Sequence, residues 1–449
     1  MLYIMYSWRA NMYRYFLAFV LILSISAGGN EVKPGLYTAE GKELLAGASK
    51  DLVVTSSCPD AIGKPGETVS FKIVPAAPPA KAEYIRVFKF LNGLEVARTD
   101  LPVQETVVTM SSDAPAHLMV TALYLSSKKR VLNPPSRITA NGDGVYIEPE
   151  KLAVARPKPA DFDAFWTKQL QQLAEVPMQV SRTEIDRSPV WKCEDVEITS
   201  IADIPVKGYL VTPLRSAPKS LPAIIYFHGA GFKSSTKQTR FGGRAIVFDV
   251  NAHGVPNGMS DEYYRNLNRG GAPADRNIRI GKDDPEKNYF KNMFLRTVRA
   301  LDFIKSLPEW DGKTLIVFGR SQGGAQSLAA AALVPEVTLC VANVPALTDH
   351  GGVMVKRKPG WPQYNTRRQK KVAQTADYID VINLAGRIKC EVIMSVGMID
   401  PICPPIGVYL TYKSIPHNNK KITLFPRLGH NAPPKDADGT ARVTKELKK

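Results

Sequence analysis

The sequence predicts an α/β fold, in which helices flank a mainly parallel sheet, preceded by a small antiparallel β-sandwich. After residue 146, short apolar runs alternate with helical patterns, which is typical of a parallel sheet covered by helices. Before residue 145, short alternating runs are separated by turn residues, as in a sandwich. We therefore expect a sandwich domain over residues 30–145 and an α/β domain over residues 146–449.

Length and composition fit a soluble globular protein. The chain has 449 residues, of which 44% are apolar and 22% charged, enough for a large core. The 59 Lys and Arg residues exceed the 42 Asp and Glu residues, but the basic residues are scattered along the chain. No helix-turn-helix, zinc finger or aromatic and basic strip is present, so we expect no nucleic-acid partner.

The N-terminus has the pattern of a secretory signal peptide. Arg9 and Arg14 precede an apolar run over residues 15–26, and small residues follow at 26–29. We expect residues 1–29 to be removed on export to the periplasm or the medium, with no membrane contact afterwards. The run is short for a bilayer-spanning helix, although retention as an anchor stays open.

The cysteines suggest neither a disulfide framework nor a metal site. There are five of them, an odd number, without paired Cys-x-x-Cys spacing: Cys58, Cys193, Cys340, Cys390 and Cys403. We interpret most of them as small buried side chains and expect no metal ion. Cys390 and Cys403 flank one expected strand, which leaves a bridge between them open.

The expected sandwich carries no evident chemistry. Its clearest strands are residues 68–73, 84–89 and 118–124, and residues 63–66 and 91–93 form turns. We interpret this domain as a spacer or packing module, with carbohydrate or partner binding as the alternative.

The α/β domain shows strands and helices in alternation. A helix is expected over residues 290–304, where apolar residues recur at spacings of four and three. Six strands are expected, over residues 223–227, 244–250, 314–318, 339–342, 391–396 and 421–425. Active groups in such sheets lie at the carboxyl ends of strands.

One motif dominates the chain: Gly319-Arg320-Ser321-Gln322-Gly323. It follows an apolar run over residues 315–318 and precedes an Ala-rich helical stretch over residues 325–333. This is the strand, turn and helix of a nucleophile elbow, in which the serine oxygen projects out of the sheet. Gly319 and Gly323 allow the strand and helix to approach, because a Cβ at either position would collide.

A serine nucleophile needs a base and an acid that orients the base. In the chain order of α/β-hydrolases, Asp or Glu and then His follow the serine. Asp400 follows the expected strand 391–396, and His430 follows the strand 421–425, so both reach the edge of the sheet that holds Ser321. We therefore assign Ser321, His430 and Asp400 as nucleophile, base and orienting acid. His417, in an expected exposed turn, is the weaker choice for the base.

The expected oxyanion hole comes from two backbone N–H groups. His228-Gly229-Ala230-Gly231 follows the strand 223–227, and a His-Gly loop at this place typically supplies one donor. We assign the hole to the N–H groups of Ala230 and Gln322. His228 is interpreted as a packing residue beside the loop.

These residues resemble the acetyl xylan esterase and cephalosporin-C deacetylase family, the seventh family of carbohydrate esterases. The resemblance covers about residues 153–445 and implies an α/β-hydrolase fold, serine-dependent removal of acetyl groups from sugars, no cofactor, and frequent homo-oligomers. The motifs that carry it are Ser321-Gln322-Gly323-Gly324, Asp400-Pro401-Ile402-Cys403-Pro404-Pro405, His430 and the stretches at residues 159–166 and 378–385.

Departures from the family pattern leave the substrate open. Asn251-Ala252-His253 stands where the family usually has Arg-Gly-Gln, and Ala230 stands where it usually has Tyr. Asn431 follows His430, where Glu is common. His253 is a candidate contact in the substrate pocket, with a structural loop residue as the alternative.

The sequence thus predicts an exported carboxylic ester hydrolase that deacetylates sugars or oligosaccharides such as acetylated xylan fragments. Three alternatives remain: a hydrolase of another small ester or amide, a carbohydrate-binding protein on a hydrolase fold, and a peptidase. All three catalytic positions hold competent residues, which disfavours a non-catalytic protein.

Overall fold

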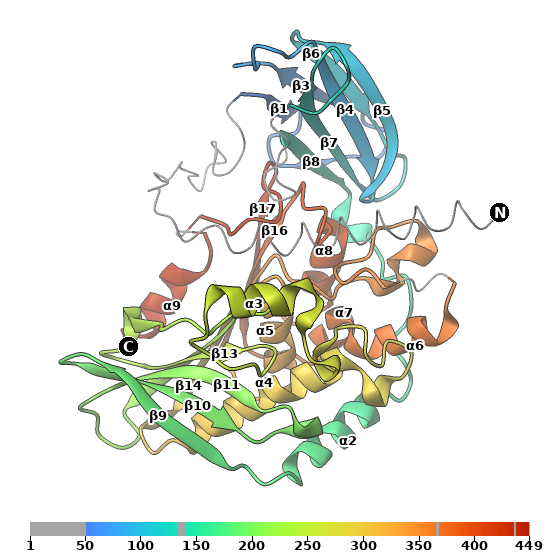
Figure 1. Ribbon diagram of the computed structural model, residues 1–449. Helices are drawn as coiled ribbons and strands as arrows, with labels where there is room; N and C mark the ends of the chain where they lie inside the picture. Colours follow the sequence, from blue (N-terminus) through green and yellow to red (C-terminus); the bar gives the residue numbers. More distant parts are fainter. Residues whose placement is uncertain (1–50, 133–140, 365–367, 435–436, 449) are drawn as a thin grey trace.

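The computed structural model describes residues 51–132, 141–364, 368–434 and 437–448 (Figure 1). The expected signal peptide, residues 1–29, lies outside these residues. Within the described ranges, no helix combines the length and the apolar character that a bilayer crossing requires.

The N-terminal region contains two antiparallel sheets packed face to face. One has the strand order β1-β3-β6, and the other has the order β2-β8-β7-β4-β5, in which only β2 and β8 are parallel. Phe71, Ile85 and Val120 fill the space between them and are fully buried. The strands are β1 Val53–Ser56, β2 Ile62–Gly63, β3 Val69–Val74, β4 Tyr84–Leu91, β5 Leu94–Pro102, β6 Thr106–Met110, β7 Ala116–Leu125 and β8 Asn141–Ile147.

The C-terminal region contains a nine-stranded sheet of order β17-β16-β15-β14-β12-β13-β11-β10-β9. The strands from β17 to β13 are parallel, and β11, β10 and β9 continue the sheet antiparallel. They are β9 Val180–Arg187, β10 Trp191–Ile198, β11 Val206–Pro213, β12 Leu221–Phe227, β13 Ile246–Asn251, β14 Trp310–Arg320, β15 Leu339–Asn343, β16 Glu391–Gly397 and β17 Lys420–Phe425.

Helices bury both faces of this sheet. Ile225 on β12 joins the core beneath α4 and α5, whereas its neighbour Ile224 joins a second core that includes Val443 of α9. This alternation follows from the period of two along a strand. The mainly parallel sheet with flanking helices is therefore confirmed. The helices are α2 Phe162–Ala174, α3 Asp261–Asn266, α4 Tyr289–Ser306, α5 Gln322–Leu333, α6 Lys370–Ile379, α7 Val381–Ala385, α8 Pro405–Ser414 and α9 Thr440–Glu446.

Helix α2 anchors the start of the α/β region through Trp166. This side chain is fully buried, its ring centroid lies 6.2 Å from that of Phe294 on α4, and its Nε1–H donates to the Tyr378 carbonyl at 3.1 Å.

We expect Trp166→Ala to lower the free energy of unfolding by about 3–5 kcal/mol, because a large buried ring is lost. Urea unfolding measures this, with Val190→Ala as the control, since Val190 is 58% exposed. Equal stability of the two variants would contradict the role of Trp166 as the anchor of α2.

Candidate active site

Ser321 occupies the sharp turn between β14 and α5. Its backbone angles are φ 59° and ψ −122°, a strained conformation for a residue with a side chain. The Ser321 N–H donates to the carbonyl of Asn343 on β15 at 2.9 Å, and the Ser321 carbonyl accepts from Ala346 at 3.0 Å. The turn is thereby fixed to the neighbouring strand, and the sequence offered no signal for Asn343 as its partner.

The two glycines of the motif are required by close backbone contacts. A Cβ on Gly319 would lie 2.1 Å from the Gly323 carbonyl oxygen, and a Cβ on Gly323 would lie 1.9 Å from the Phe227 carbonyl oxygen. Both separations are far below any contact distance, so only glycine fits. The expected collision is confirmed at both positions.

The structure brings the three predicted catalytic side chains into one hydrogen-bonded chain. His430 Nε2 lies 2.9 Å from Ser321 Oγ, and His430 Nδ1 lies 2.7 Å from Asp400 Oδ2. A carboxylate only accepts hydrogen bonds, so Nδ1 carries the proton and Nε2 is left to accept from the serine hydroxyl. At 7%, 5% and 1% exposure for Ser321, His430 and Asp400, the three groups are shielded from water.

The loops that carry Asp400 and His430 are joined to each other. Asp400 follows β16, His430 follows β17, and these strands are parallel neighbours. The Met398 N–H donates to the Phe425 carbonyl at 2.9 Å, and the Ile399 N–H donates to the Leu428 carbonyl at 3.1 Å. The acid and the base therefore belong to a single bonded unit at the carboxyl edge of the sheet.

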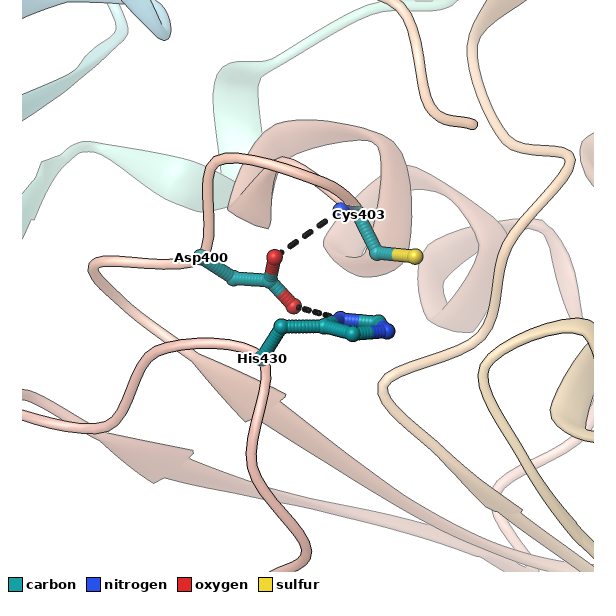
Figure 2. A group of neighbouring side chains, drawn as sticks. All are labelled: Asp400, Cys403 and His430. Carbon is teal, nitrogen blue, oxygen red and sulfur yellow. Dashed lines mark hydrogen bonds and ion pairs between the residues drawn. The ribbon is translucent and has the colours of Figure 1, made fainter. Parts of the chain in front are cut away.

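Backbone donors hold the carboxylate of Asp400 in place. Its Oδ1 accepts from the N–H groups of Ile402 and Cys403, at 2.8 and 2.9 Å, and Figure 2 shows the hydrogen bond from Cys403. With Oδ2 directed at the His430 ring, both oxygens are used, and the carboxylate cannot rotate without losing three hydrogen bonds. The backbone of the loop that follows the acid therefore fixes the orientation of its carboxylate.

Cys403 places a thiol beside the acid and the base. Among the residues that the structure describes, Asp400, Cys403 and His430 form the group of potential metal ligands, and their ligand atoms lie within 4.8 Å of one another (Figure 2). The sequence spacing did not reveal this cluster. Both ring nitrogens of His430 and both oxygens of Asp400 already have partners within the protein, which fits proton transfer. Burial, reinforced by the Asp400 charge, raises the pKa of the Cys403 thiol well above its usual value.

All five cysteines are free, so the bridge between Cys390 and Cys403 that the sequence left open does not form.

Two backbone groups border the serine where the oxyanion hole is predicted. Gln322 is the first residue of α5, and the first N–H groups of a helix have no acceptor within the helix. The loop that follows β12 lies against the serine, because a Cβ on Gly229 would be 3.7 Å from Ser321 Cβ. Ala230 is the next residue of that loop. Gln322 thus follows the serine directly, Ala230 follows the glycine that faces it, and the role of their N–H groups in stabilising an oxyanion stays a prediction.

His228 supports the loop of residues 228–231 after β12, here called the oxyanion loop after its predicted role. Its Nδ1 lies 2.6 Å from the Gly229 carbonyl, and its Nε2 accepts from the Ala252 N–H at 3.2 Å. These partners assign the proton to Nδ1. Burial lowers the pKa of His228 well below its usual value, so the ring stays neutral and serves in packing.

His253 is only 2% exposed and lies behind the same loop. Its ring centroid is 4.5 Å from that of Phe232, and its Nδ1 lies 2.6 Å from the Tyr289 hydroxyl oxygen. The side chain thus supports the oxyanion loop, which agrees with the interpretation of His253 as a structural residue. A direct contact with substrate stays a prediction.

The residues that depart from the family pattern form hydrogen bonds with neighbouring segments of the protein. Asn251 is 1% exposed, and its Nδ2 donates to the carbonyls of Lys233 and Val255 at 3.0 and 3.2 Å. The Ala252 carbonyl accepts from Arg296 on α4 at 3.2 Å. Asn251-Ala252-His253 therefore ties β13 to the oxyanion loop and to α4.

A family model described as acetyl xylan esterase (AXE1) matches residues 150–444. The chain belongs to the acetyl xylan esterase family. Acetyl esterase Axe7A from Xylanibacter ruminicola is 34% identical over 280 residues, which are 60% of this chain. The match spans 63% of the length of that relative.

Solved structures of acetyl xylan esterases share the fold of the α/β region. Acetyl xylan esterase 1 from Thermoanaerobacterium sp. is 27% identical with a TM-score of 0.58, and the match covers 67% of this chain and 98% of that protein. The enzyme from Paenibacillus sp. R4 is 24% identical with a TM-score of 0.54, over 64% and 95% of the two chains. An α/β-hydrolase fold preceded by antiparallel sheets is thus confirmed.

The buried imidazole of His253 predicts sensitivity to acid. Burial lowers its pKa from 6.5 to about 3. Above pH 6.5 the ring is neutral in both states, but below it the unfolded chain binds a proton that the folded chain does not. The free energy of unfolding should therefore fall as the pH falls from 6.5 toward 3. We expect His253→Gln to reduce the slope near pH 5 by up to about 1.4 kcal/mol per pH unit. Urea unfolding at several pH values measures the slope of the free energy of unfolding against pH. An unchanged slope in His253→Gln would contradict the assignment of this slope to His253.

Proposed function

We propose that this protein is a serine carboxylic ester hydrolase that removes acetyl groups from acetylated sugars or oligosaccharides such as acetylated xylan fragments. The observation that carries the proposal is the continuous chain of hydrogen bonds from Asp400 through His430 to Ser321. Membership of the acetyl xylan esterase family supports it independently.

In the first half of the reaction, Ser321 Oγ attacks the acetyl carbonyl carbon while His430 Nε2 takes the hydroxyl proton. The carbonyl oxygen becomes an oxyanion, which the N–H groups of Ala230 and Gln322 stabilise. Collapse of this intermediate breaks the bond to the sugar oxygen, which receives the proton from His430. The sugar leaves with a free hydroxyl group, and Ser321 carries the acetyl group.

In the second half, water attacks the acetyl-enzyme. His430 takes a proton from the water, a second oxyanion forms in the same hole, and its collapse returns the proton to Ser321 and releases acetate. Asp400 fixes the imidazole tautomer and stabilises the imidazolium in both halves. Apart from the substrate and the attacking water, the groups in these steps are residues of the chain.

The names of the relatives support an acetylated carbohydrate as the substrate. The curated relative is an acetyl esterase, and the solved structure at 27% identity is an acetyl xylan esterase. Since the residues around the oxyanion loop depart from the family pattern, we propose acetylated oligosaccharides as the class without naming one ester. We further propose that the enzyme is exported, because residues 1–29 have the pattern of a signal peptide. We also propose that it forms homo-oligomers, which the family resemblance implies.

The central test compares acetate release by the native protein, Ser321→Ala and Ser327→Ala. Ser327 lies on the same helix, buried, with its hydroxyl bonded to the Gly323 carbonyl at 3.0 Å, so it controls for the loss of a buried hydroxyl. We expect Ser321→Ala to lose about three or more orders of magnitude in kcat. Ser327→Ala should stay within about threefold of the native protein.

The substrate panel contains acetylated xylo-oligosaccharides, a simple acetyl ester, a butyrate ester and an acetylated amine. Higher kcat/KM on the oligosaccharides is the expected result. Activity confined to the amide or the longer ester would contradict the proposed substrate class. Full activity in Ser321→Ala would contradict the mechanism.

A further inference from the structure

The N-terminal sandwich contacts the α/β region at the loops that carry Asp400 and His430. Figure 1 shows β7 and β8 at the end of the sandwich that faces β16, β17 and α8. The Gly144 N–H on β8 donates to the Pro426 carbonyl at 3.1 Å, four residues before His430. The strand therefore adds a hydrogen bond to the segment that leads into the base.

Gly144 on β8 allows a loop backbone to lie directly on the strand. A Cβ on Gly144 would be 2.4 Å from the Met398 carbonyl oxygen, whereas a Cβ on Gly142 would first meet the Val120 carbonyl oxygen of the sandwich itself, at 2.6 Å. Gly144 therefore faces the segment that precedes Asp400. Any side chain at Gly144 would displace Met398, which is two residues from the acid.

A partly buried ion pair adds a second contact. Asp143 on β8 is 3% exposed, and its Oδ2 lies 3.8 Å from Nε of Arg427, three residues before His430. The same oxygen accepts from the Ser56 N–H at 2.8 Å. Ser56 on β1 thus holds the carboxylate of β8 that faces the segment leading to the base.

Tyr146 makes a third contact, with the segment that follows the acid. Its hydroxyl donates to the Pro405 carbonyl at the start of α8 at 2.7 Å, and its ring centroid lies 5.2 Å from that of Tyr409. The side chain is fully buried. The loop from Asp400 to α8 is therefore fixed at Met398 before the acid and at Pro405 after it.

We infer that the sandwich is a positioning unit for the catalytic acid and base, with Gly144 and Tyr146 as its positioning residues. This inference rests on the proposed function, because it assigns the sandwich a role in the same site. The acid and base loops are bonded to each other through Met398 and Ile399. A shift of either loop is therefore passed to the other and changes the distance from His430 to Ser321. The sandwich thus has a role in turnover that a spacer or a separate binding module would not have.

A matched pair of tyrosine variants tests the inference. Tyr146→Phe removes one hydroxyl that donates to a backbone carbonyl of the α/β region. Tyr124→Phe removes the same group from β7, where the hydroxyl donates to the Asp51 carbonyl at 2.7 Å inside the sandwich region. We expect kcat on a simple acetyl ester to fall about threefold to tenfold in Tyr146→Phe, with KM within about twofold. Tyr124→Phe should match the native protein.

A glycine pair gives the stronger perturbation. Gly144→Ala places a Cβ against the Met398 backbone, whereas Gly63→Ala on β2 meets only side-chain atoms, the nearest at 3.0 Å. We expect kcat to fall at least about tenfold in Gly144→Ala, again with little change in KM, because misplacement of catalytic groups by about 1 Å costs up to 100-fold. Gly63→Ala should stay within about twofold. Rates are expressed per active site, titrated with a fluorophosphonate, so that loss of folded protein is not counted as loss of kcat.

The possible results distinguish the positioning role of the sandwich from the proposed esterase function. Native kcat in folded Gly144→Ala and Tyr146→Phe, alongside an inactive Ser321→Ala, would overturn the positioning role and leave the esterase intact. If Gly144→Ala does not fold, equal kcat values for Tyr146→Phe and Tyr124→Phe overturn it instead. A native protein without esterase activity would overturn the proposed function, whatever the sandwich variants do.

Discussion

The architecture of the site depends on one steric constraint, the absence of room for a Cβ between α5 and the strands beneath it. Gly323 lies on the backbone of β12, and Gly319 lies on the first turn of α5. This approach forces Ser321 into a strained turn and projects its side chain beyond the sheet edge. The same approach brings the start of α5 next to the loop after β12. One contact between helix and strand therefore positions both the nucleophile and the predicted oxyanion donors.

The acid and base reach the serine because β16 and β17 extend the same parallel sheet. Their loops lie at the edge where β14 ends, and hydrogen bonds between the loops make them a single unit. Beside the loop that follows β12, the half-buried His228 and the buried His253 contribute rings that stay neutral, because desolvation lowers the pKa of both. Substitution of the usual family triplet by Asn251-Ala252-His253 is compatible with this support, because each of the three residues finds partners within the protein.

The sequence predicted the strands from β12 to β17 of the large sheet and missed β9, β10 and β11, although β11 is buried along almost its whole length. Residues 315–318 form a continuous apolar run at the centre of the sheet, so β14 was clear. Strand β9 lies at the sheet edge, almost wholly exposed, and has no apolar pattern to find. Strand β8 begins Asn141-Gly142-Asp143-Gly144, which is typical of a turn, and it runs to Ile147, past the expected boundary at residue 145. The triad residues were predictable from chain order, whereas the contacts of Cys403 and of β8 depend on tertiary packing between distant segments.

The central claim is that Ser321 is the nucleophile activated by His430 and Asp400. Its most direct test is covalent labelling with a fluorophosphonate, followed by tryptic mapping. Trypsin cleaves after Arg320, so Ser321 begins its own peptide, and fragmentation distinguishes it from Ser327. We expect one adduct per chain, located on Ser321, that appears in step with the loss of esterase activity. Loss of activity with the label on another residue, or full labelling of Ser321 with activity retained, would contradict it.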